Sequence, residues 1–353
     1  MDKIIIVQKL ISWMLIIAVL LPFIRNDYWI FRILEYPRNQ KFFVSVIVLG
    51  SLFFTSNYTI TDITTIALLA ACVIYLSYKI WPYTFLAKKE MLSIPSGNLN
   101  GKNQLKVFSA NVYQENTDYT RMLRQIEEND PDVIFLLETN KQWEEHMDVL
   151  IRRYPHCLKK PLENTYGLLF YSRYEIVEGK INFLVEKDVP SIEATLLTPG
   201  GKKIKVWGLH PKPPIPGEDN RSTAKDKELM KVALKAKNHK DAVIVMGDLN
   251  DVAWSYVTEL FRKTSELLDP RRGRGFYSTF SANHWYMRFP LDYVFCSAHF
   301  GLIQMKRLGH NGSDHFAMLI HLQYDSQLKK IHRKPVADAR EKNEAVEKAT
   351  HAV

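Results

Sequence analysis

A carboxylate and an amide follow a short apolar run in the second half of the chain. Residues 242–246 read as a strand buried on both faces, and Gly247 ends the run. Asp248 and Asn250 come next with one residue between them, so an extended chain points both side chains the same way. The Asp could orient or deprotonate a water molecule while the Asn donates hydrogen bonds to an anionic oxygen. A strand followed by a plain turn explains this stretch alone equally well.

More polar side chains occur at or beside the ends of other predicted strands. Taken singly, each is more often a solvated strand end or a structural histidine, and a carboxylate directly after apolar residues is costly unless it is paired or bound to a metal. Chance does not easily place so many of them at strand ends. The set is Asn111, Glu138, His210, Asp292, Asp314 and His315.

Together these side chains indicate metal-assisted hydrolysis of a phosphate ester. Glu138 with Asp314 would form an oxygen-rich cation site, which suits Mg²⁺ or Mn²⁺ better than zinc. His315 can donate to a phosphoryl oxygen while Asp292 holds its tautomer. Asp248 would activate water, and the donors for developing charge would be Asn111, Asn250 and His210.

A basic loop, residues 269–277, contains Arg271, Arg272 and Arg274. It is either a solvated loop or a place where one or two arginines contact substrate phosphate or an anionic lipid surface. Arg288, at the start of a later predicted strand, is a further candidate for the substrate phosphate.

The composition permits a polyanionic partner without requiring one. The net charge of +9 is modest for 353 residues and is spread along the chain. The three cysteines, Cys72, Cys157 and Cys296, form no CxxC pair, which argues against a cysteine metal site or a disulfide framework.

The first ninety residues are strongly apolar and predict about three transmembrane helices, with two as the alternative. The apolar runs are residues 4–24, 42–60 and 63–81, each close to the roughly 20 residues that span a bilayer. The loop after the first run carries Arg25, Arg32, Arg38 and Lys41, whereas residues 56–62 contain no Lys or Arg. The positive-inside rule then places the C-terminal domain in the cytoplasm, although two lysines in the first ten residues argue weakly against this.

Changes of composition divide the chain into four segments. Residues 1–90 are the predicted anchor, and residues 91–104, rich in Pro, Gly, Ser and Asn, are a linker. Residues 105–324 alternate predicted strands and helices, as an α/β catalytic domain does. Residues 325–353 are rich in Lys, Glu and Ala and predict a disordered tail or a solvated helix.

The order of these motifs resembles the endonuclease/exonuclease/phosphatase superfamily, the DNase I-like group. Gly-Asp-Leu-Asn at 247–250 and Ser-Asp-His at 313–315 carry the resemblance, together with Leu-Glu at 137–138 and Leu-Asp-Tyr-Val at 291–294. It covers roughly residues 105–324. The resemblance implies a four-layer α/β sandwich, in which two packed mixed sheets are flanked by helices and the active site lies at one rim. The apolar N-terminal segment and His-Pro-Lys-Pro-Pro at 210–214 are similar to the membrane-anchored bacterial branch, which implies an integral protein of the inner membrane.

The resemblance also assigns roles to residues. It implies that Glu138 binds the metal with Asn111 beside it, that Asp248 orients water, and that Asn250 and His210 contact phosphate. Asp314 and His315 match the terminal pair, and Asp292 supports the histidine. Some nuclease members carry an acid two residues after the first Asn, but this chain has Tyr113 there, which puts a second metal ligand in doubt.

These observations favour an Mg²⁺-dependent phosphodiesterase or phosphatase. A nuclease-like substrate is slightly favoured, because the arginine loop could track a phosphate backbone. A phospholipid headgroup or lipid-linked phosphate is the alternative, since the anchor would hold the domain beside a bilayer. A non-catalytic membrane-tethered scaffold is the third reading, although such scaffolds usually lose an acid or the histidine.

Overall fold

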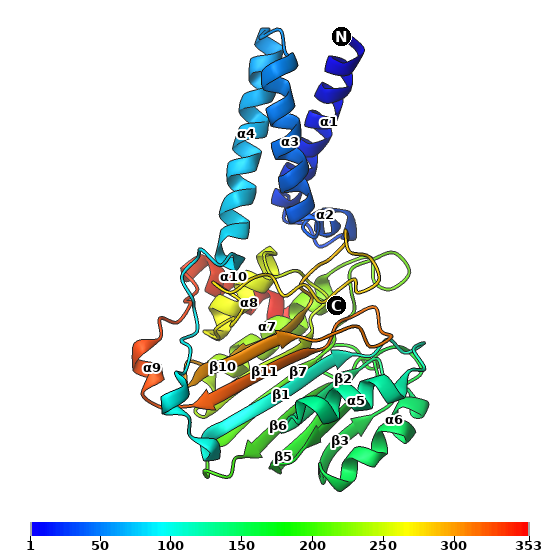
Figure 1. Cartoon of the computed structure of the whole chain (residues 1–353), viewed down its shortest axis with the longest axis vertical. Helices are drawn as coiled ribbons and strands as arrows, with labels where there is room; N and C mark the ends of the chain where they lie inside the picture. The colour runs from blue at the N-terminus through cyan, green and yellow to red at the C-terminus, as the bar shows by residue number, and fades with distance from the viewer. Residues whose placement is uncertain (1, 352–353) are drawn as a thin grey trace.

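Three long helices form the N-terminal stem (Figure 1). The computed structural model describes residues 2–351, and the stem helices are α1 (Asp2–Leu20), α3 (Arg38–Thr55) and α4 (Ile60–Ile80). A capping box between Thr59 and Asp62 starts α4. The helices pack against one another through a small apolar cluster that includes Ile16, Val19, Val48, Leu52, Leu69 and Leu76.

Two helices in the described part of the chain are long and apolar enough to cross a membrane. They cover Ile4–Phe23 and Ile60–Tyr83. Helix α3 lies beside them but begins with Arg38, Asn39, Gln40 and Lys41, which lowers its hydropathy. The expectation of three spans therefore stays a prediction.

A short connecting segment, residues 21–37 between α1 and α3, joins the stem to the domain. Its helix α2 covers Trp29–Ile33. The Trp29 amide donates to the Asn220 carbonyl over 2.9 Å, and a guanidinium nitrogen of Arg38 donates to the Trp254 carbonyl over 2.5 Å. The stem therefore has fixed contacts with the domain below it.

The domain contains two mixed β-sheets. The first has the strand order β10-β11-β1-β2-β4-β3, in which β1 and β2 run parallel and the other neighbours antiparallel. Its strands are β1 (Gln104–Asn111), β2 (Val133–Leu137), β3 (His156–Lys160), β4 (Leu168–Ser172), β10 (Phe300–Arg307) and β11 (Met318–Tyr324).

The second sheet has the order β5-β6-β7-β8-β9, with β7 and β8 parallel. Its strands are β5 (Glu175–Asn182), β6 (Ser191–Leu197), β7 (Lys203–Leu209), β8 (Ala242–Asp248) and β9 (Asp292–Cys296).

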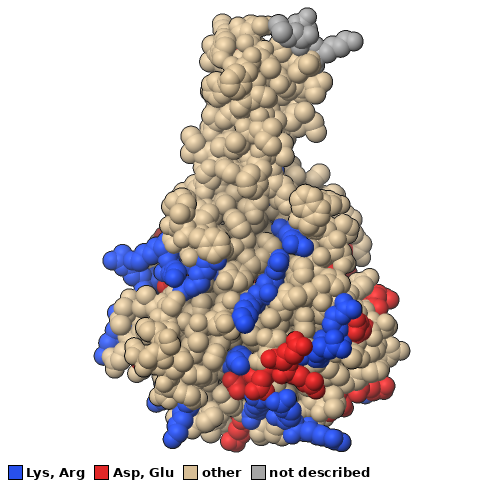
Figure 2. All heavy atoms as spheres, viewed as in Figure 1, with Lys and Arg blue, Asp and Glu red and all other residues tan. Residues whose placement is uncertain are grey.

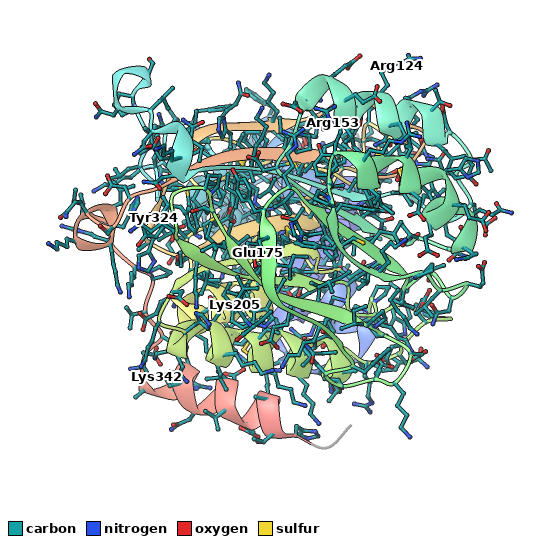
Figure 3. All side chains as sticks on the ribbon, turned by 90° about the horizontal axis from the view of Figure 1, so that it is seen from below. Arg124, Arg153, Glu175, Lys205, Tyr324 and Lys342 are labelled. Atoms are coloured by element: carbon teal, nitrogen blue, oxygen red, sulfur yellow. The ribbon has the colours of Figure 1, made fainter. Side chains whose placement is uncertain are left out.

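The two sheets pack face to face, and helices cover their outer faces. One core cluster joins Val107 and Phe135 of the first sheet to Val206 and Ile244 of the second. The helices are α5 (Tyr119–Asn129) and α6 (Lys141–Met147) on the first sheet and α7 (Thr223–Asn238) and α8 (Tyr256–Ser265) on the second. Figure 3 shows the same layering from below, with Arg124 of α5 and Lys342 of the C-terminal helix on opposite outer faces. The predicted four-layer α/β sandwich is confirmed.

The C-terminal segment is partly helical. Residues 325–351, for which a disordered tail or a solvated helix was expected, contain α9 (Leu328–Ile331) and α10 (Ala339–Thr350). Ala345 and Ala349 of α10 are buried in the core cluster of α7 and α8. Small alanines form this contact, which explains why the composition looked too polar to pack.

The linker is also fixed to the domain. Met91 is buried, and the Ile94 amide donates to the Leu302 carbonyl of β10 over 2.8 Å. Short 3₁₀ turns complete the chain: Leu21–Phe23, Trp81–Tyr83, Ser96–Asn98, Gly101–Asn103 and Asp148–Arg152.

Candidate active site

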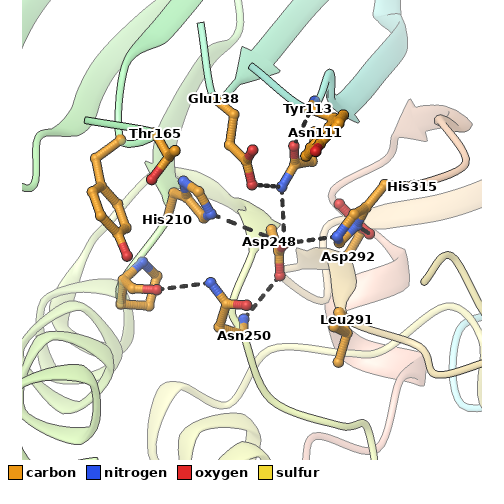
Figure 4. Close-up of polar contacts among 12 residues, drawn as sticks. Asn111, Tyr113, Glu138, Thr165, His210, Asp248, Asn250, Leu291, Asp292 and His315 are labelled. Carbon is orange, nitrogen blue, oxygen red and sulfur yellow. Dashed lines mark hydrogen bonds and ion pairs between the residues drawn. The ribbon is translucent and has the colours of Figure 1, made fainter. Parts of the chain in front are cut away.

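The predicted site residues converge where the two parallel strand pairs end (Figure 4). Asn111 is the last residue of β1, and Glu138 directly follows β2, its parallel neighbour. Asp248 is the last residue of β8, and His210 directly follows the parallel strand β7. Carboxyl ends of parallel strands meet at one edge of a sheet, so each pair contributes its polar residues to the same place.

The backbone around these residues adopts left-handed conformations. Glu138 has φ +58° and Asn250 has φ +49°, which few residues other than glycine adopt. Gly247 has φ +130°, and a Cβ atom there would lie 2.0 Å from the Leu209 carbonyl oxygen. Strained backbone of this kind concentrates at functional sites, where it aims side chains that regular strands would point elsewhere.

Asn111 and the backbone of Asn250 hold the two central carboxylates. The Asn111 Nδ2 atom donates to Glu138 Oε1 over 2.6 Å and to Asp248 Oδ2 over 3.3 Å. The backbone amide of Asn250 donates to Asp248 Oδ1 over 2.9 Å. Both oxygens of Asp248 are therefore fixed in orientation.

His315 forms an acid–imidazole pair with Asp292 and also faces Asp248. Its Nδ1 lies 2.9 Å from Asp292 Oδ2, and its Nε2 lies 3.5 Å from Asp248 Oδ2. Burial alone would lower the pKa of His315, but the carboxylates of Asp292 and Asp248 outweigh it and raise the pKa to about 10. At neutral pH this histidine is an imidazolium that can donate hydrogen bonds.

Burial shifts the pKa values of Asp248 and His210 in opposite directions. Burial raises the pKa of Asp248 to about 7, although the charge of His315 opposes the rise. Burial lowers the pKa of His210 to about 3, and the charge of His315 acts in the same direction. His210 is thus neutral, and its Nδ1 atom is buried without a hydrogen-bond partner among the described residues. A carboxylate that titrates near neutrality has the property required of a general base.

The donor atoms suit a hard divalent cation. Burial raises the pKa of the Glu138 carboxyl, and the nearby Asp314 carboxylate adds to this effect, as two anions that share one cation would. Both carboxylates line the same pocket. Asp248, Asp292 and His315 also offer ligand atoms within 4.8 Å of one another, but the hydrogen bond of Asp292 to His315 already occupies one carboxylate oxygen. These oxygen donors fit a divalent cation.

The pocket above these residues has a volume of about 580 Å³ and two different surfaces. Its floor carries the polar set, whereas most of its walls are apolar. One wall consists of residues of the connecting segment: Ile33, Leu34, Tyr36 and Pro37. The other apolar lining residues are Pro213, Pro214, Ile215, Phe280, Met287, Phe289 and Leu291.

Asn250 has more structural contacts than the sequence indicated. Its Nδ2 atom donates to the Pro211 carbonyl over 3.0 Å, and its own carbonyl accepts a 2.7 Å hydrogen bond from the Tyr36 hydroxyl. Asn250 therefore joins the proline-rich loop and the connecting segment to the end of β8.

The four arginines that were candidates for the substrate phosphate make other contacts in the structure. Arg271 is buried and paired with Asp269 over 2.8 Å, and Arg272 lies 3.2 Å from Glu90. Arg274 donates to the Met91 carbonyl over 2.6 Å, and Arg288 lies over the Phe316 ring. None of these four arginines lines the pocket described above. Their guanidinium groups stabilise the packing of loop 269–277 or line a different cavity.

Sequence reasoning missed two contributors to the site. The Tyr166 ring lies 5.3 Å from the His210 ring, and its hydroxyl donates to Glu218 over 2.6 Å. The sequence around Tyr166 predicts only the end of a strand and does not mark this residue as part of a site. Ile33 and Leu34 were assigned to the anchor, and their sequence does not mark them as part of a catalytic pocket.

Comparisons with known proteins agree with this geometry. A family model described as the Endonuclease/Exonuclease/phosphatase family matches residues 98–315. No curated protein matches the sequence.

Several solved structures share the fold at low sequence identity. D. rerio TDP2 complexed with a single-strand DNA product is 19% identical, with a TM-score of 0.52, and covers 62% of this chain and 99% of that chain. The human Nocturnin catalytic domain is 17% identical, with a TM-score of 0.52, and covers 69% and 99%. A Bacteroides thetaiotaomicron mannosyl-6-phosphatase is 17% identical, with a TM-score of 0.51, and covers 62% and 100%. At these identities the likeness shows the fold alone.

Proposed function

The chain belongs to the Endonuclease/Exonuclease/phosphatase family, whose members hydrolyse phosphate esters, and from this premise we propose a membrane-anchored, Mg²⁺-dependent phosphoesterase whose substrate carries a lipid chain. The observation that carries the proposal is the composition of the pocket. Its floor holds carboxylates and imidazoles, and its wall holds Ile33 and Leu34 from the segment that joins two stem helices. A phosphate headgroup suits the floor, and an apolar chain suits the wall.

The exposed surface of the stem supports the membrane anchor. Ile47 and Phe54 of α3 are 70% and 91% exposed, and Ile4 and Ile74 of the neighbouring helices are also exposed. Figure 2 shows an upper stem without Lys, Arg, Asp or Glu on the viewed face, with charged side chains on the domain below. Outward apolar residues on all three helices support α3 as a third span beside the two more apolar helices.

The position of the domain supports a cytoplasmic orientation. Arg25, Arg32, Arg38 and Lys41 lie at the end of the stem that contacts the domain, and residues 56–62 at the other end contain no Lys or Arg. The positive-inside rule therefore supports a catalytic domain on the cytoplasmic face of the inner membrane.

The roles of the site residues follow from their protonation and contacts. Asp248 would orient a water molecule and accept its proton, and the imidazolium of His315 would donate to a phosphoryl oxygen. His210 would add a neutral N–H donor. Glu138 and Asp314 would hold the Mg²⁺ ion, which when bound supplies positive charge next to the phosphoryl group.

A nucleic acid is the less favoured substrate. The slight preference for a nuclease drew in part on an arginine loop that could track a phosphate backbone, and Arg271 and Arg272 of that loop form ion pairs with protein carboxylates. The intact set of site residues favours an enzyme over a binding scaffold.

The test uses the full-length protein in detergent micelles with Mg²⁺, and with EDTA as the metal-free control. Matched pairs of substrates separate the headgroup from the chain: phosphatidic acid against glycerol phosphate, and phosphatidylglycerol against its deacylated form. Plasmid DNA, abasic-site DNA and RNA complete the panel. We expect kcat/KM to be at least about tenfold higher for one chain-bearing substrate than for its soluble partner, because an apolar contact of a methylene or more contributes about that much discrimination.

Two variants sharpen the result. Asp248→Asn should abolish activity on every substrate, whereas Leu34→Ser should lower kcat/KM only for the chain-bearing member of the pair. Phe54→Ser, which removes an exposed apolar side chain far from the pocket, is the matched control and should change neither. Equal rates on both members, or activity on nucleic acid alone, would exclude the lipid-linked substrate.

A further inference from the structure

We propose a second lipid site, separate from the catalytic pocket, that binds the phosphate headgroup of an anionic phospholipid between Arg288 and Arg307. The proposal rests on the membrane anchor argued above but not on catalysis. The two arginines line a cavity of about 820 Å³ together with Arg274 and residues 83–86 and 275–278.

The cavity begins where the last stem helix ends. The candidate span Ile60–Tyr83 stops at the residue that opens the cavity, and Thr84, Phe85 and Leu86 continue along its rim. This position is the depth at which phospholipid headgroups lie when α4 spans the bilayer. In Figure 2, Lys and Arg side chains gather on the domain directly beneath the stem.

The three arginines that line the cavity lack counter-ions. Within residues 2–351, none of them forms an ion pair, whereas the neighbouring Arg271 and Arg272 each do. The Arg274 guanidinium donates to the Pro270 and Met91 carbonyls and to the Ser93 hydroxyl, so Arg288 and Arg307 provide the donors for the headgroup. The Arg288 guanidinium lies 5.1 Å from the Phe316 ring centre, and its Nε is buried without a hydrogen-bond partner. Removing a cluster of cations from water costs free energy unless an anion neutralises the cluster.

Arg288 and Arg307 share the Phe316 ring. The Arg307 guanidinium lies 4.3 Å from the ring centre, and one of its nitrogens donates to the Ser278 carbonyl over 2.8 Å. Burial lowers the pKa of Arg307, and the charge of Arg288 lowers it further. A phosphate between the two guanidinium groups would relieve this repulsion and satisfy the free donors, because guanidinium and phosphate match in geometry.

The apolar part of the cavity selects a lipid over a free anion. Phe85 is 82% exposed and Leu86 is 78% exposed, although both are large and apolar. Phe276 and Tyr277 also line the cavity. Exposed apolar residues beside uncompensated cations match an amphiphile, whereas inorganic phosphate or an oligonucleotide would use only the arginines.

The experiment measures lipid binding to the full-length protein, in an Asp248→Asn background so that hydrolysis cannot interfere. Native mass spectrometry counts phosphatidylglycerol and phosphatidylcholine molecules bound after release from nanodiscs that contain equal amounts of both. We expect one phosphatidylglycerol to be retained preferentially. Arg288→Gln with Arg307→Gln should weaken this retention by roughly tenfold or more, since each basic residue near the surface contributes substantially to attraction of anionic lipid.

The matched control replaces two other basic residues in the same region. Lys88→Gln with Lys89→Gln removes the same charge from exposed positions that do not line the cavity, and retention should be unchanged. Phe85→Ser with Leu86→Ser should reduce retention while leaving both guanidinium groups in place. The unfolding temperature of each variant in detergent shows that it is folded.

Three outcomes would overturn the proposal. They are equal retention of the two lipids, equal loss in the arginine and lysine variants, and competition by inorganic phosphate or an oligonucleotide as effective as that by phosphatidylglycerol. Inactivity toward phosphate esters would contradict the proposed function and leave this binding result unaffected.

Discussion

Replacing the buried carboxylate of Asp248 by an amide should stabilise the protein while it abolishes hydrolysis. Asp248 is 1% exposed, and burial raises its pKa from 3.8 to about 7. The folded state therefore binds a proton that the unfolded state releases. Ionisation of this group destabilises the folded protein increasingly as pH rises from about 4 to about 7, and the full effect remains above that range.

The expected change in unfolding free energy follows from the pKa shift of Asp248. Three pKa units correspond to about 4 kcal/mol, because each unit corresponds to about 1.4 kcal/mol. The amide introduced by Asp248→Asn would also present N–H groups to existing donors such as the Asn250 backbone amide, which costs about 1–2 kcal/mol. A net gain of ~2 kcal/mol in unfolding free energy raises Tm by about 4–8 °C for a domain of this size.

The assay is thermal unfolding of full-length wild type and Asp248→Asn in detergent with EDTA, from pH 4.5 to 8. The difference in Tm should be small at the acid end and grow toward pH 7. Asp292→Asn is the control: it removes the hydrogen-bonded partner of His315 and should lower Tm at neutral pH. A lower Tm for Asp248→Asn at pH 7.5, or a difference that does not vary with pH, would refute the argument.

Three further predictions concern a glycine, a metal ligand and the C-terminal helix. Gly247→Ala should lower the unfolding free energy by about 2–4 kcal/mol in denaturant titrations, because its Cβ would clash with a backbone oxygen 2.0 Å away at a positive φ; an unchanged midpoint would contradict this. Glu138→Gln should remove the rise in Tm that Mg²⁺ or Mn²⁺ produces in the wild type, without lowering Tm in EDTA, since a buried carboxylate is lost; an undiminished metal effect would exclude Glu138 as a ligand. Ala345→Arg should lower the unfolding free energy by about 1–3 kcal/mol, because the larger side chain overpacks the contact of α10 with the domain. It should also expose residues 333–338 to limited proteolysis. Cleavage equal to that of the wild type would show that α10 tolerates the change.

The polar ends of the buried strands were predictable from sequence for a physical reason. Strands such as β2 and β8 are buried on both faces, so a carboxylate at or directly after their last position stands out against five or more apolar residues. The order of these motifs carried the resemblance that implied the sandwich fold. Strands β3, β5 and β10 carry mixed or exposed faces and lack that contrast.

Long-range packing decided the features that sequence reasoning missed or misassigned. Arg271 is charged and follows Pro270, as a surface loop residue would be, yet Asp269 and the Tyr293 ring make it a buried residue. The alanines of α10 carry little hydrophobicity by themselves and pack only because α7 and α8 offer a surface for them. No local pattern could show that Ile33 lies against the catalytic pocket, about a hundred residues before Glu138.

The wall that residues 33–37 add to the pocket has a consequence for biogenesis. These residues are made early, between two stem helices, whereas Asp314 and His315 are among the last residues of the domain to be synthesised. The pocket is complete only when the finished domain has folded against the stem. On the proposed function, a nascent chain would therefore lack a competent site until both parts have been made.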